Sequence, residues 1–181
     1  MTQAVIAHCR AGFEVECAAD IERIAAGAGV SLSIDAQRDR AFVTATGRFD
    51  PLRWAKALAA VPPMFARSVF TGSGPHTLSS RNRVSPIVAL ATSLGPRYQC
   101  VWLETADTNQ GKMKSGLCRR LAPLLESAME AAGTLASGET RLPRLHVMFA
   151  GDHDAWIGVS HVRTGSASRG MPIGQGLPVR A

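Results

Sequence analysis

The stretch AVIAHCRAGFEVECAADIERIAAG, residues 4–27, decides the fold of the first part of the chain. Its first six residues, ending at Cys9, are almost all apolar, which favours a buried strand. The residues that follow have helical periodicity, because the apolar side chains of Phe13, Cys17, Ile21 and Ile24 share one helical face while charged side chains point elsewhere. Glycines then end the helix. The stretch therefore predicts a strand followed by an amphipathic helix.

The same alternation of periods continues to residue 71. The expected elements are a half-exposed strand at 30–35, a return strand at 41–46 after the polar turn Asp39-Arg40, a helix opened by Asp50-Pro51, and a strand at 65–71. The order β-α-β-β-α-β is the ferredoxin-like plan. We therefore expect an α+β fold whose first domain spans residues 1–73.

A second domain is expected after a break in composition. Residues 72–83, GSGPHTLSSRNR, hold Gly, Ser and Pro and predict a linker or an exposed loop. The elements expected after it are a helix at 84–94, a strand at 98–105, a long helix capped by Asp107 or Thr108 and kinked or split at Pro123, and strands at 145–150 and 155–162 flanking the turn 151–154. The predicted second domain is 74–165, and residues 166–181 are a tail or a linker.

Composition limits the class of protein. Apolar residues make up 46% of the 181 residues, which excludes wholesale disorder. No apolar run reaches 18 residues and no secretory signal is recognisable, so we expect a cytoplasmic protein that makes no contact with a membrane. The four cysteines, Cys9, Cys17, Cys100 and Cys118, contain no C-x-x-C pair, and we expect reduced thiols.

The charge points to an anionic partner. The net charge is +6, and the 20 basic residues comprise 17 Arg and 3 Lys. Arginine presents a planar fork that suits phosphate and stacks on bases. Residues 1–80 carry 8 basic and 7 acidic side chains, whereas residues 81–181 carry 12 and 7. A nucleic acid that contacts mainly the second half would explain this excess, and so would a GC-rich genome that favours Arg codons.

Basic residues of the second half are the candidate RNA contacts. The candidates are Lys112, Lys114, Arg119, Arg120, Arg81, Arg83, Arg141, Arg144, Arg163 and Arg169. The first four lie at the start of the predicted long helix, where free backbone N–H groups also favour a phosphate. In a continuous helix Lys112 and Arg119 share a face, and together with Arg120 they form the more exposed set. The alternative is an ordinary solvated helix face.

Motifs for catalysis or cofactor binding are missing from the sequence. The possible metal ligands are His146, Asp152, His153, Asp154 and His161, but their spacing matches no compact site, and turns favour Asp for conformational reasons. There is no G-x-S-x-G elbow, and no glycine-rich stretch has the spacing of a phosphate or dinucleotide loop. We therefore expect no catalytic, cofactor-binding or metal-binding residue in this chain.

Several stretches together resemble a known family. They are CRAGFEVECAADI (9–21), FARSVF (65–70), RVSPIV (83–88), ADTNQGKMKSGLCRRLAPLL (106–125) and RLHVMF (144–149), in one order and with matching spacing. In these stretches the chain is similar to the N-terminal half of the ribosomal RNA large subunit methyltransferase M family. The most specific of them is ADTN followed by a basic helix start.

The resemblance implies a ferredoxin-like domain followed by a THUMP-like RNA-binding domain. The family transfers a methyl group from S-adenosylmethionine to a cytidine ribose 2′-oxygen of 23S rRNA, with a Rossmann-like domain whose D-x-G-x-x-P-G-G-type loop has no match here. The resemblance thus implies that this chain binds 23S rRNA or its precursor beside that C-terminal methyltransferase domain, without binding S-adenosylmethionine or catalysing transfer itself. Two alternatives remain: a free-standing ferredoxin-like regulatory or small-ligand-binding module, and a small metal-dependent enzyme that uses the His/Asp turn.

Overall fold

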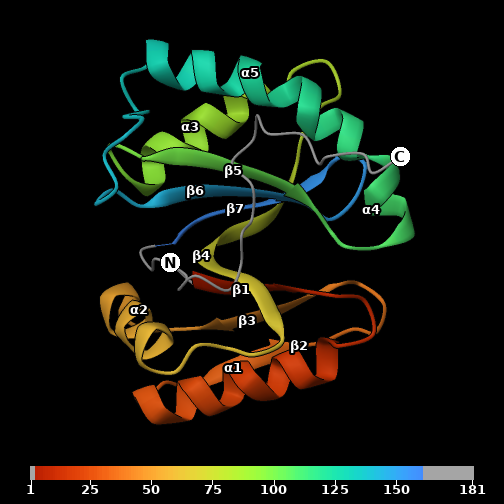
Figure 1. The fold of residues 1–181 in the computed structure, drawn as a ribbon, viewed down its shortest axis with the longest axis vertical. Coiled ribbons are helices and arrows are strands. Elements are labelled where there is room, and N and C mark those ends of the chain that lie inside the picture. Colours follow the sequence, from red (N-terminus) through yellow and green to blue (C-terminus); the bar gives the residue numbers. More distant parts are fainter. Residues whose placement is uncertain (1–2, 161–181) are drawn as a thin grey trace, which may run out of the picture.

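The structure forms one seven-stranded sheet covered by helices (Figure 1). It is a computed structural model that describes residues 3–160. The strands are β1 (Gln3–Cys9), β2 (Leu32–Asp35), β3 (Phe42–Gly47), β4 (Ala66–Thr77), β5 (Cys100–Thr105), β6 (Arg144–Phe149) and β7 (Asp154–Ser160). The helices are α1 (Glu14–Ala28), α2 (Pro51–Ala60), α3 (Val84–Leu94), α4 (Asn109–Met113) and α5 (Ser115–Ala131). The strand order across the sheet is β2-β3-β1-β4-β7-β6-β5.

The first four strands and two helices have the predicted ferredoxin-like arrangement. β1 lies between β3 and β4 and is antiparallel to both. Alternate residues of β1 point to opposite faces, so Val5 packs with Ile21 of α1 and Trp54 of α2 in one core cluster. Helix α2 begins as predicted, with Pro51 in its first turn and the Asp50 side chain as its cap.

Strand β4 joins the two halves of the sheet, so the predicted linker at 72–83 is wrong in its first part. Residues 66–72 of β4 pair with β1, and residues 71–77 pair with β7 around a bulge. Gly72 lies opposite Gly158 at this crossing, where a Cβ on either glycine would collide with the backbone of the other strand. The glycine that indicated a loop therefore permits the close approach of two strands.

The second half follows the predicted order, with one difference in its helices. β5 and β6 are parallel, and β6 and β7 form the predicted hairpin. The chain breaks its helix at Lys114, between α4 and α5, whereas α5 continues through Pro123. The predicted split at Pro123 is therefore wrong. Proline costs the helix one hydrogen bond, and the burial of Leu121 and Leu125 on either side of it offsets that loss.

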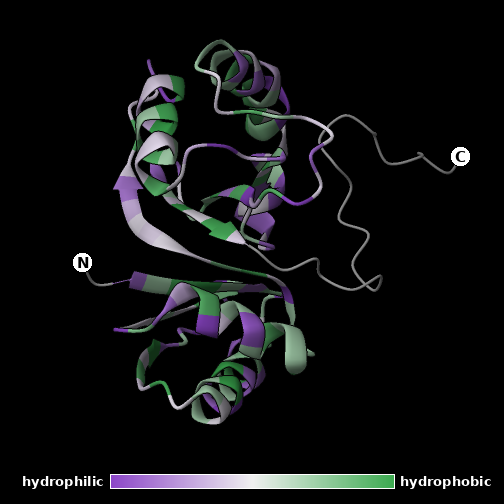
Figure 2. Cartoon of the chain, turned by 90° about the vertical axis from the view of Figure 1, so that its left-hand side faces the viewer, coloured by the Kyte–Doolittle hydropathy of each residue, from purple (hydrophilic) through white to green (hydrophobic). Residues whose placement is uncertain are grey.

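The two halves of the sheet lie one above the other, so that the molecule has four layers (Figure 2). α1 and α2 cover the outer face of the N-terminal half, and α3 and α5 cover that of the C-terminal half. A third apolar cluster includes Ile6, Phe42 and Phe70 from the first half and Met148 and Trp156 from the second. The two halves therefore share a buried interface.

Candidate nucleic-acid interface

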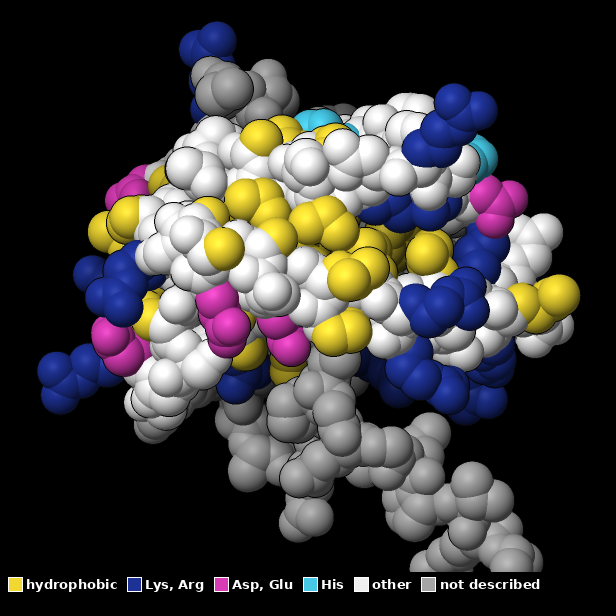
Figure 3. Space-filling model, turned by 90° about the horizontal axis from the view of Figure 1, so that it is seen from above, with side chains coloured by type: hydrophobic (Ala, Val, Ile, Leu, Met, Phe, Trp, Pro, Cys, Tyr) yellow, Lys and Arg dark blue, Asp and Glu magenta, His cyan; other side chains and the backbone are white. Residues whose placement is uncertain are grey.

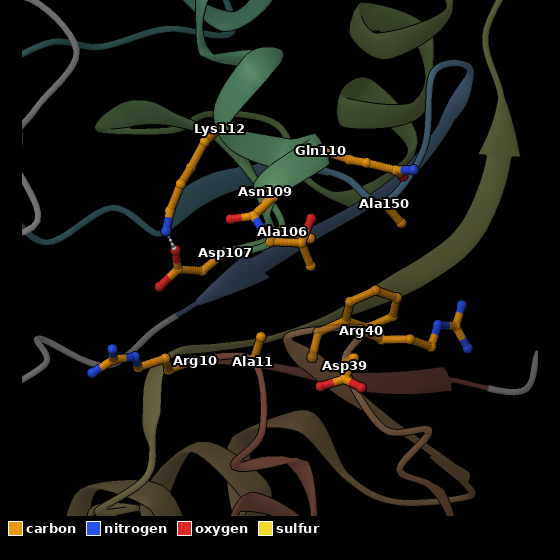
Figure 4. Close-up of a pocket in the computed structure, with 12 residues that line it drawn as sticks. Arg10, Ala11, Asp39, Arg40, Ala106, Asp107, Asn109, Gln110, Lys112 and Ala150 are labelled. Carbon is orange, nitrogen blue, oxygen red and sulfur yellow. Dashed lines mark ion pairs between the residues drawn. The ribbon is translucent and has the colours of Figure 1, made fainter.

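An open cleft of about 700 Å³ lies between the two halves of the molecule (Figure 4). Its lower wall comes from the turns after β1 and β2 and carries Arg10 and Arg40, while its upper wall comes from the end of β5 and from α4. A backbone bridge between Arg10 and Asp107 joins the two walls. The full lining is Arg10, Ala11, Asp39, Arg40, Phe42, Ala106, Asp107, Thr108, Asn109, Gln110, Lys112 and Ala150.

The upper wall is formed by the segment ADTNQGK, which follows β5. The Thr108 hydroxyl caps α4 by accepting a hydrogen bond from the Gly111 N–H at 3.0 Å. The Thr105 hydroxyl donates to the Gly111 carbonyl, also at 3.0 Å. A Cβ at position 111 would collide with the Ala106 carbonyl oxygen, so only glycine fits. These contacts fix the turn from which Lys112 extends into the cleft.

The lower wall is held by a buried carboxylate. Glu14 is 1% exposed and accepts hydrogen bonds from the backbone N–H groups of Gly12 at 3.0 Å and Ala41 at 2.8 Å. The contact links the turn after β1 to the turn after β2, where Asp39 and Ala41 have left-handed φ angles of 62° and 61°. Strain of this kind persists only where surrounding contacts hold it. Glu14 therefore positions the turn that carries Arg40.

One acidic side chain connects the basic groups of the cleft. Asp107 accepts a hydrogen bond from the Arg67 guanidinium at 2.8 Å and lies 3.8 Å from the Lys112 ammonium. The side chains of Arg67 and Lys112 are 61% and 69% exposed. Among the charged residues that line the cleft, Arg10, Arg40 and Lys112 outnumber Asp39 and Asp107, and Arg67 adds a further cation, so the pair of walls keeps an excess of positive charge.

The two arginines of the lower wall add to this excess. Arg10 is exposed and forms no ion pair with another residue in the described range 3–160. Arg40 lies 4.7 Å above the ring of Phe42 and 3.5 Å from the Asp35 carboxylate, in an exposed pair. Stacking orients its planar guanidinium along the wall.

The structure divides the predicted basic residues into separate groups. Lys112 lines the cleft. Lys114 instead pairs with the Asp152 carboxylate at 3.0 Å, and Arg83 donates to the Asp152 carbonyl at 3.1 Å. The hydrogen bond and the charge of Lys114 lower the pKa of Asp152. Figure 3 shows that Lys and Arg side chains gather at the end of the molecule where α4 lies.

The remaining predicted contacts lie elsewhere. Arg81, Arg119 and Arg120 are exposed, before α3 and on α5. Arg141 precedes β6 and Arg144 begins it, beside Cys100 at the start of β5, so both lie at the opposite end of these strands from the cleft. Arg163 and Arg169 lie outside the described residues.

The single long helix predicted after Asp107 is divided into two helices. Lys112 belongs to the five-residue α4, and the helix breaks at Lys114 before α5 begins. Lys112 and Arg119 therefore do not share a helix face. The prediction that Lys112, Arg119 and Arg120 are exposed is confirmed.

A buried polar cluster connects the two half-sheets. Its central residue, Glu104, precedes the upper-wall segment by two residues. Glu104 accepts hydrogen bonds from the His8 ring at 2.9 Å and from the Ser68 hydroxyl at 3.0 Å. His146 lies 4.0 Å from the same carboxylate and stacks on Phe70 with ring centroids 4.9 Å apart. Burial lowers the pKa of His146 to about 4. Burial also opposes the charged form of Glu104, but the hydrogen bond and charge of His8 outweigh it and lower the pKa of Glu104.

The possible metal ligands do not come together. His146 lies between the half-sheets, whereas Asp152, His153 and Asp154 belong to the hairpin turn and the start of β7, and His161 lies outside the described residues. Within residues 3–160, no group of three His, Cys, Asp or Glu side chains could hold a metal ion. The four cysteines are free, as expected. The described helices include none that is long and apolar enough to cross a membrane.

Comparison with known proteins assigns both walls of the cleft to one family. The family model for the RlmM ferredoxin-like domain matches residues 1–51, which contain the lower wall. The family model for ribosomal RNA large subunit methyltransferase M, N-terminal, matches residues 82–161, which contain the upper wall. The chain belongs to the ribosomal RNA large subunit methyltransferase M family.

Curated members of the methyltransferase M family are similar over most of this chain. The protein from Thauera aminoaromatica is 36% identical over 162 residues, which cover 84% of this chain and 43% of the relative. The protein from Azoarcus sp. strain BH72 is 33% identical over 184 residues, covering 96% of this chain and 47% of the relative. The chain thus spans about half the length of these relatives.

A solved structure shares the fold. TrmN from Thermus thermophilus superimposes with a TM-score of 0.52 at 13% identity, over 87% of this chain and 45% of that one. At this identity the likeness shows the fold alone. The same fold therefore occurs in a protein whose sequence is only distantly similar.

The sequence did not predict that the first half of the chain contributes basic residues to the cleft. The charge excess of the second half indicates Lys112 but not Arg10, Arg40 or Arg67, which lie in a half that is nearly neutral. One signal was present. Arg10 directly follows the first predicted strand and Arg40 lies in a predicted turn, and both positions are strand ends, where loops carry binding residues.

Proposed function

We propose that this chain is the RNA-binding portion of a ribosomal RNA methyltransferase and that RNA lies in the cleft between its halves. One observation carries the proposal: Arg10 and Arg40 from one family-matched region and Lys112 from the other line a single opening of about 700 Å³, with Arg67 at its border. In this proposal residues 1–73 are a ferredoxin-like domain and residues 74–165 a THUMP-like RNA-binding domain.

The cleft suits a phosphate backbone better than base edges. Arg10 and Arg67 are exposed guanidinium groups that can each hold a phosphate with two hydrogen bonds. Lys112 extends from a capped turn and supplies a mobile point charge. Contacts of this kind depend on the shape and charge of the RNA and hardly on its sequence. The substrate we propose is 23S rRNA or its precursor.

We propose that the cleft is not the site of S-adenosylmethionine. The sulfonium and amino groups of that cofactor are cations, and the cleft presents Arg10, Arg40 and Lys112 to them. Of its two acidic side chains, Asp107 is engaged by Arg67 and Lys112, and Asp39 is outnumbered by the three cations of the lining. Because the curated relatives are about twice as long, we propose that a C-terminal methyltransferase domain supplies the cofactor site and methylates a cytidine 2′-oxygen, while this portion holds the RNA.

A salt titration tests this function. Labelled fragments of 23S rRNA are titrated with the 181-residue chain at several salt concentrations. We expect log affinity to fall linearly with log salt, by roughly 0.7–0.9 for each phosphate contact. Affinity that does not respond to salt would favour a regulatory or small-ligand module. Calorimetry with S-adenosylmethionine is the second arm, and stoichiometric binding there would contradict the proposed division of labour.

A further inference from the structure

Two phenylalanines form an exposed stacked pair beside the cleft. The rings of Phe13 and Phe65 have centroids 5.9 Å apart and planes at 19°. The two residues are 41% and 36% exposed, and neighbouring Met64 is 79% exposed. Rings in a core are covered on both faces, whereas these keep aromatic surface open to solvent. Contiguous exposed apolar side chains of this kind are a feature of binding surfaces.

The backbone under this pair is held by buried polar contacts. Asp20, which is 5% exposed, accepts hydrogen bonds from the N–H groups of Met64 at 2.7 Å and Phe65 at 3.0 Å. Arg23 donates to the same carboxylate at 2.8 Å. On the other side, the Phe13 N–H closes a turn at the start of α1. Both rings therefore project from fixed positions, which limits the entropy lost when a ligand stacks on them.

The pair is continuous with the basic groups of the cleft. The Phe13 N–H donates to the Arg10 carbonyl at 3.1 Å. Phe65 precedes Arg67 by two residues, and Arg67 pairs with Asp107 of the upper wall. The pair is thus joined through the backbone to two exposed arginines, Arg10 in the lining of the cleft and Arg67 paired with its residue Asp107. A molecule that fits both features has a flat apolar group joined to phosphates.

We propose that the Phe13–Phe65 pair is a stacking site for an unpaired RNA base whose neighbouring phosphates lie on Arg10 and Arg67. The inference rests on the proposed function, because it extends the path of the RNA out of the cleft. The exposed acids on α1 are Glu16, in its first turn, and Glu22, about two turns further along, whereas Glu14 is buried and bound to backbone N–H groups. Aromatic side chains stack on any base, so the site adds affinity without sequence preference.

A base analogue tests the site directly. A short single-stranded RNA that contains 2-aminopurine is titrated with three forms of the chain: the native chain, the double variant Phe13→Leu with Phe65→Leu, and the double variant Phe13→Tyr with Phe65→Tyr. Leucine keeps the apolar character but removes the ring, and tyrosine keeps the ring. We expect stacking to quench the fluorescence with the native and tyrosine forms. With the leucine form quenching should be lost and affinity should fall about 5- to 100-fold.

The outcomes separate this inference from the function on which it rests. Salt-dependent RNA binding that is equal in the native and leucine forms, with equal quenching, overturns the stacking site and leaves the cleft intact. Failure of the native chain to bind RNA at any salt concentration overturns the proposed function and the stacking site together. Circular dichroism confirms that the leucine form is folded.

Discussion

A single buried carboxylate determines the shape of the lower wall. Glu14 satisfies backbone donors in two turns, one of which holds Ala41 in a left-handed conformation. We expect Glu14→Ala to lower the free energy of unfolding by about 1–3 kcal/mol for each donor left without a partner. RNA affinity should fall as well, since Arg40 loses its fixed position. Chemical denaturation and RNA titration measure the two effects.

The neighbouring residue Glu16 supplies the matched control. It is exposed in the same helical turn, and Glu16→Ala should change stability by less than about 0.5 kcal/mol. Equal stability of the Glu14 and Glu16 variants would contradict the account of the lower wall.

The buried His146 predicts how stability depends on pH. Burial lowers its pKa in the folded state to about 4, whereas the unfolded chain has the ordinary value of 6.5. Between these values the unfolded state binds a proton that the folded state does not, so stability falls as pH is lowered from about 6.5 to about 4. We expect a loss on the order of 3 kcal/mol across this window.

Two variants isolate this effect from the other histidines. His146→Gln removes the titrating ring and should flatten the pH dependence of unfolding between about pH 4 and 6.5 relative to the native chain. His153→Gln, at an exposed turn position, should leave that dependence unchanged. If denaturation curves of the His146 variant keep the native slope, the acid sensitivity has another source.

At the scale of elements, the crossing of β4 and β7 depends on two glycines. A Cβ at Gly72 would collide with the Ile157 carbonyl, and one at Gly158 with the Thr71 carbonyl. We expect Gly72→Ala or Gly158→Ala to destabilise the protein by at least about 2 kcal/mol, because two backbones must separate. The measurement is the denaturation midpoint by circular dichroism.

Gly27 provides the opposite expectation in the same molecule. It lies inside α1, and a methyl group added there would have no atom within 4 Å, so Gly27→Ala should stabilise by about 0.5–1 kcal/mol. If the alanine variants of Gly72, Gly158 and Gly27 are all destabilised to a similar extent, the close approach of β4 and β7 is not the cause of the loss of stability.

The positions of the main helices and strands can be predicted from local sequence, whereas the segments that connect them cannot. Apolar periodicity predicts β1, α1 and the other main elements, because each buries one face. The strand character of residues 72–77 escaped prediction, since Gly and Pro there reflect pairing with a distant strand. The break at Lys114 was not predicted either, whereas Pro123 is tolerated inside α5, where Leu121 and Leu125 on either side of it are buried. The cleft combines turns that no local pattern relates.

At the scale of the whole molecule, β4 couples the two halves. It pairs with β1 along one part and β7 along the other, and the third apolar cluster joins the half-sheets. The amide hydrogens of the paired residues Gly72, Ser73, His76 and Thr77 should therefore exchange about as slowly as those of β1 in a mass-spectrometric experiment. Fast exchange there, with slow exchange on both sides, would show that this part of β4 does not couple the two halves.

The three exposed basic residues predicted from the sequence, Lys112, Arg119 and Arg120, differ in whether they line the cleft. Changing Lys112, Arg119 and Arg120 to alanine should weaken RNA binding through Lys112, which lies in the cleft, with little change in stability because all three are exposed. The loss should be the same for all RNA sequences, as expected for phosphate contacts. A sequence-dependent loss in filter binding would contradict a role limited to the backbone.

The central claim is that RNA lies in the cleft, and one comparison of charge variants tests it most directly. The cleft variant changes Arg10, Arg40 and Lys112 to alanine. The matched variant changes Arg48, Arg53 and Lys56, exposed residues just before and within α2, and removes the same charge. We predict that the cleft variant loses affinity for 23S rRNA fragments and reduces the slope of log affinity against log salt by roughly 2–3, while the matched variant stays near the native values. Equal losses in the two folded variants would show that RNA responds to net charge alone and would contradict the cleft as its site.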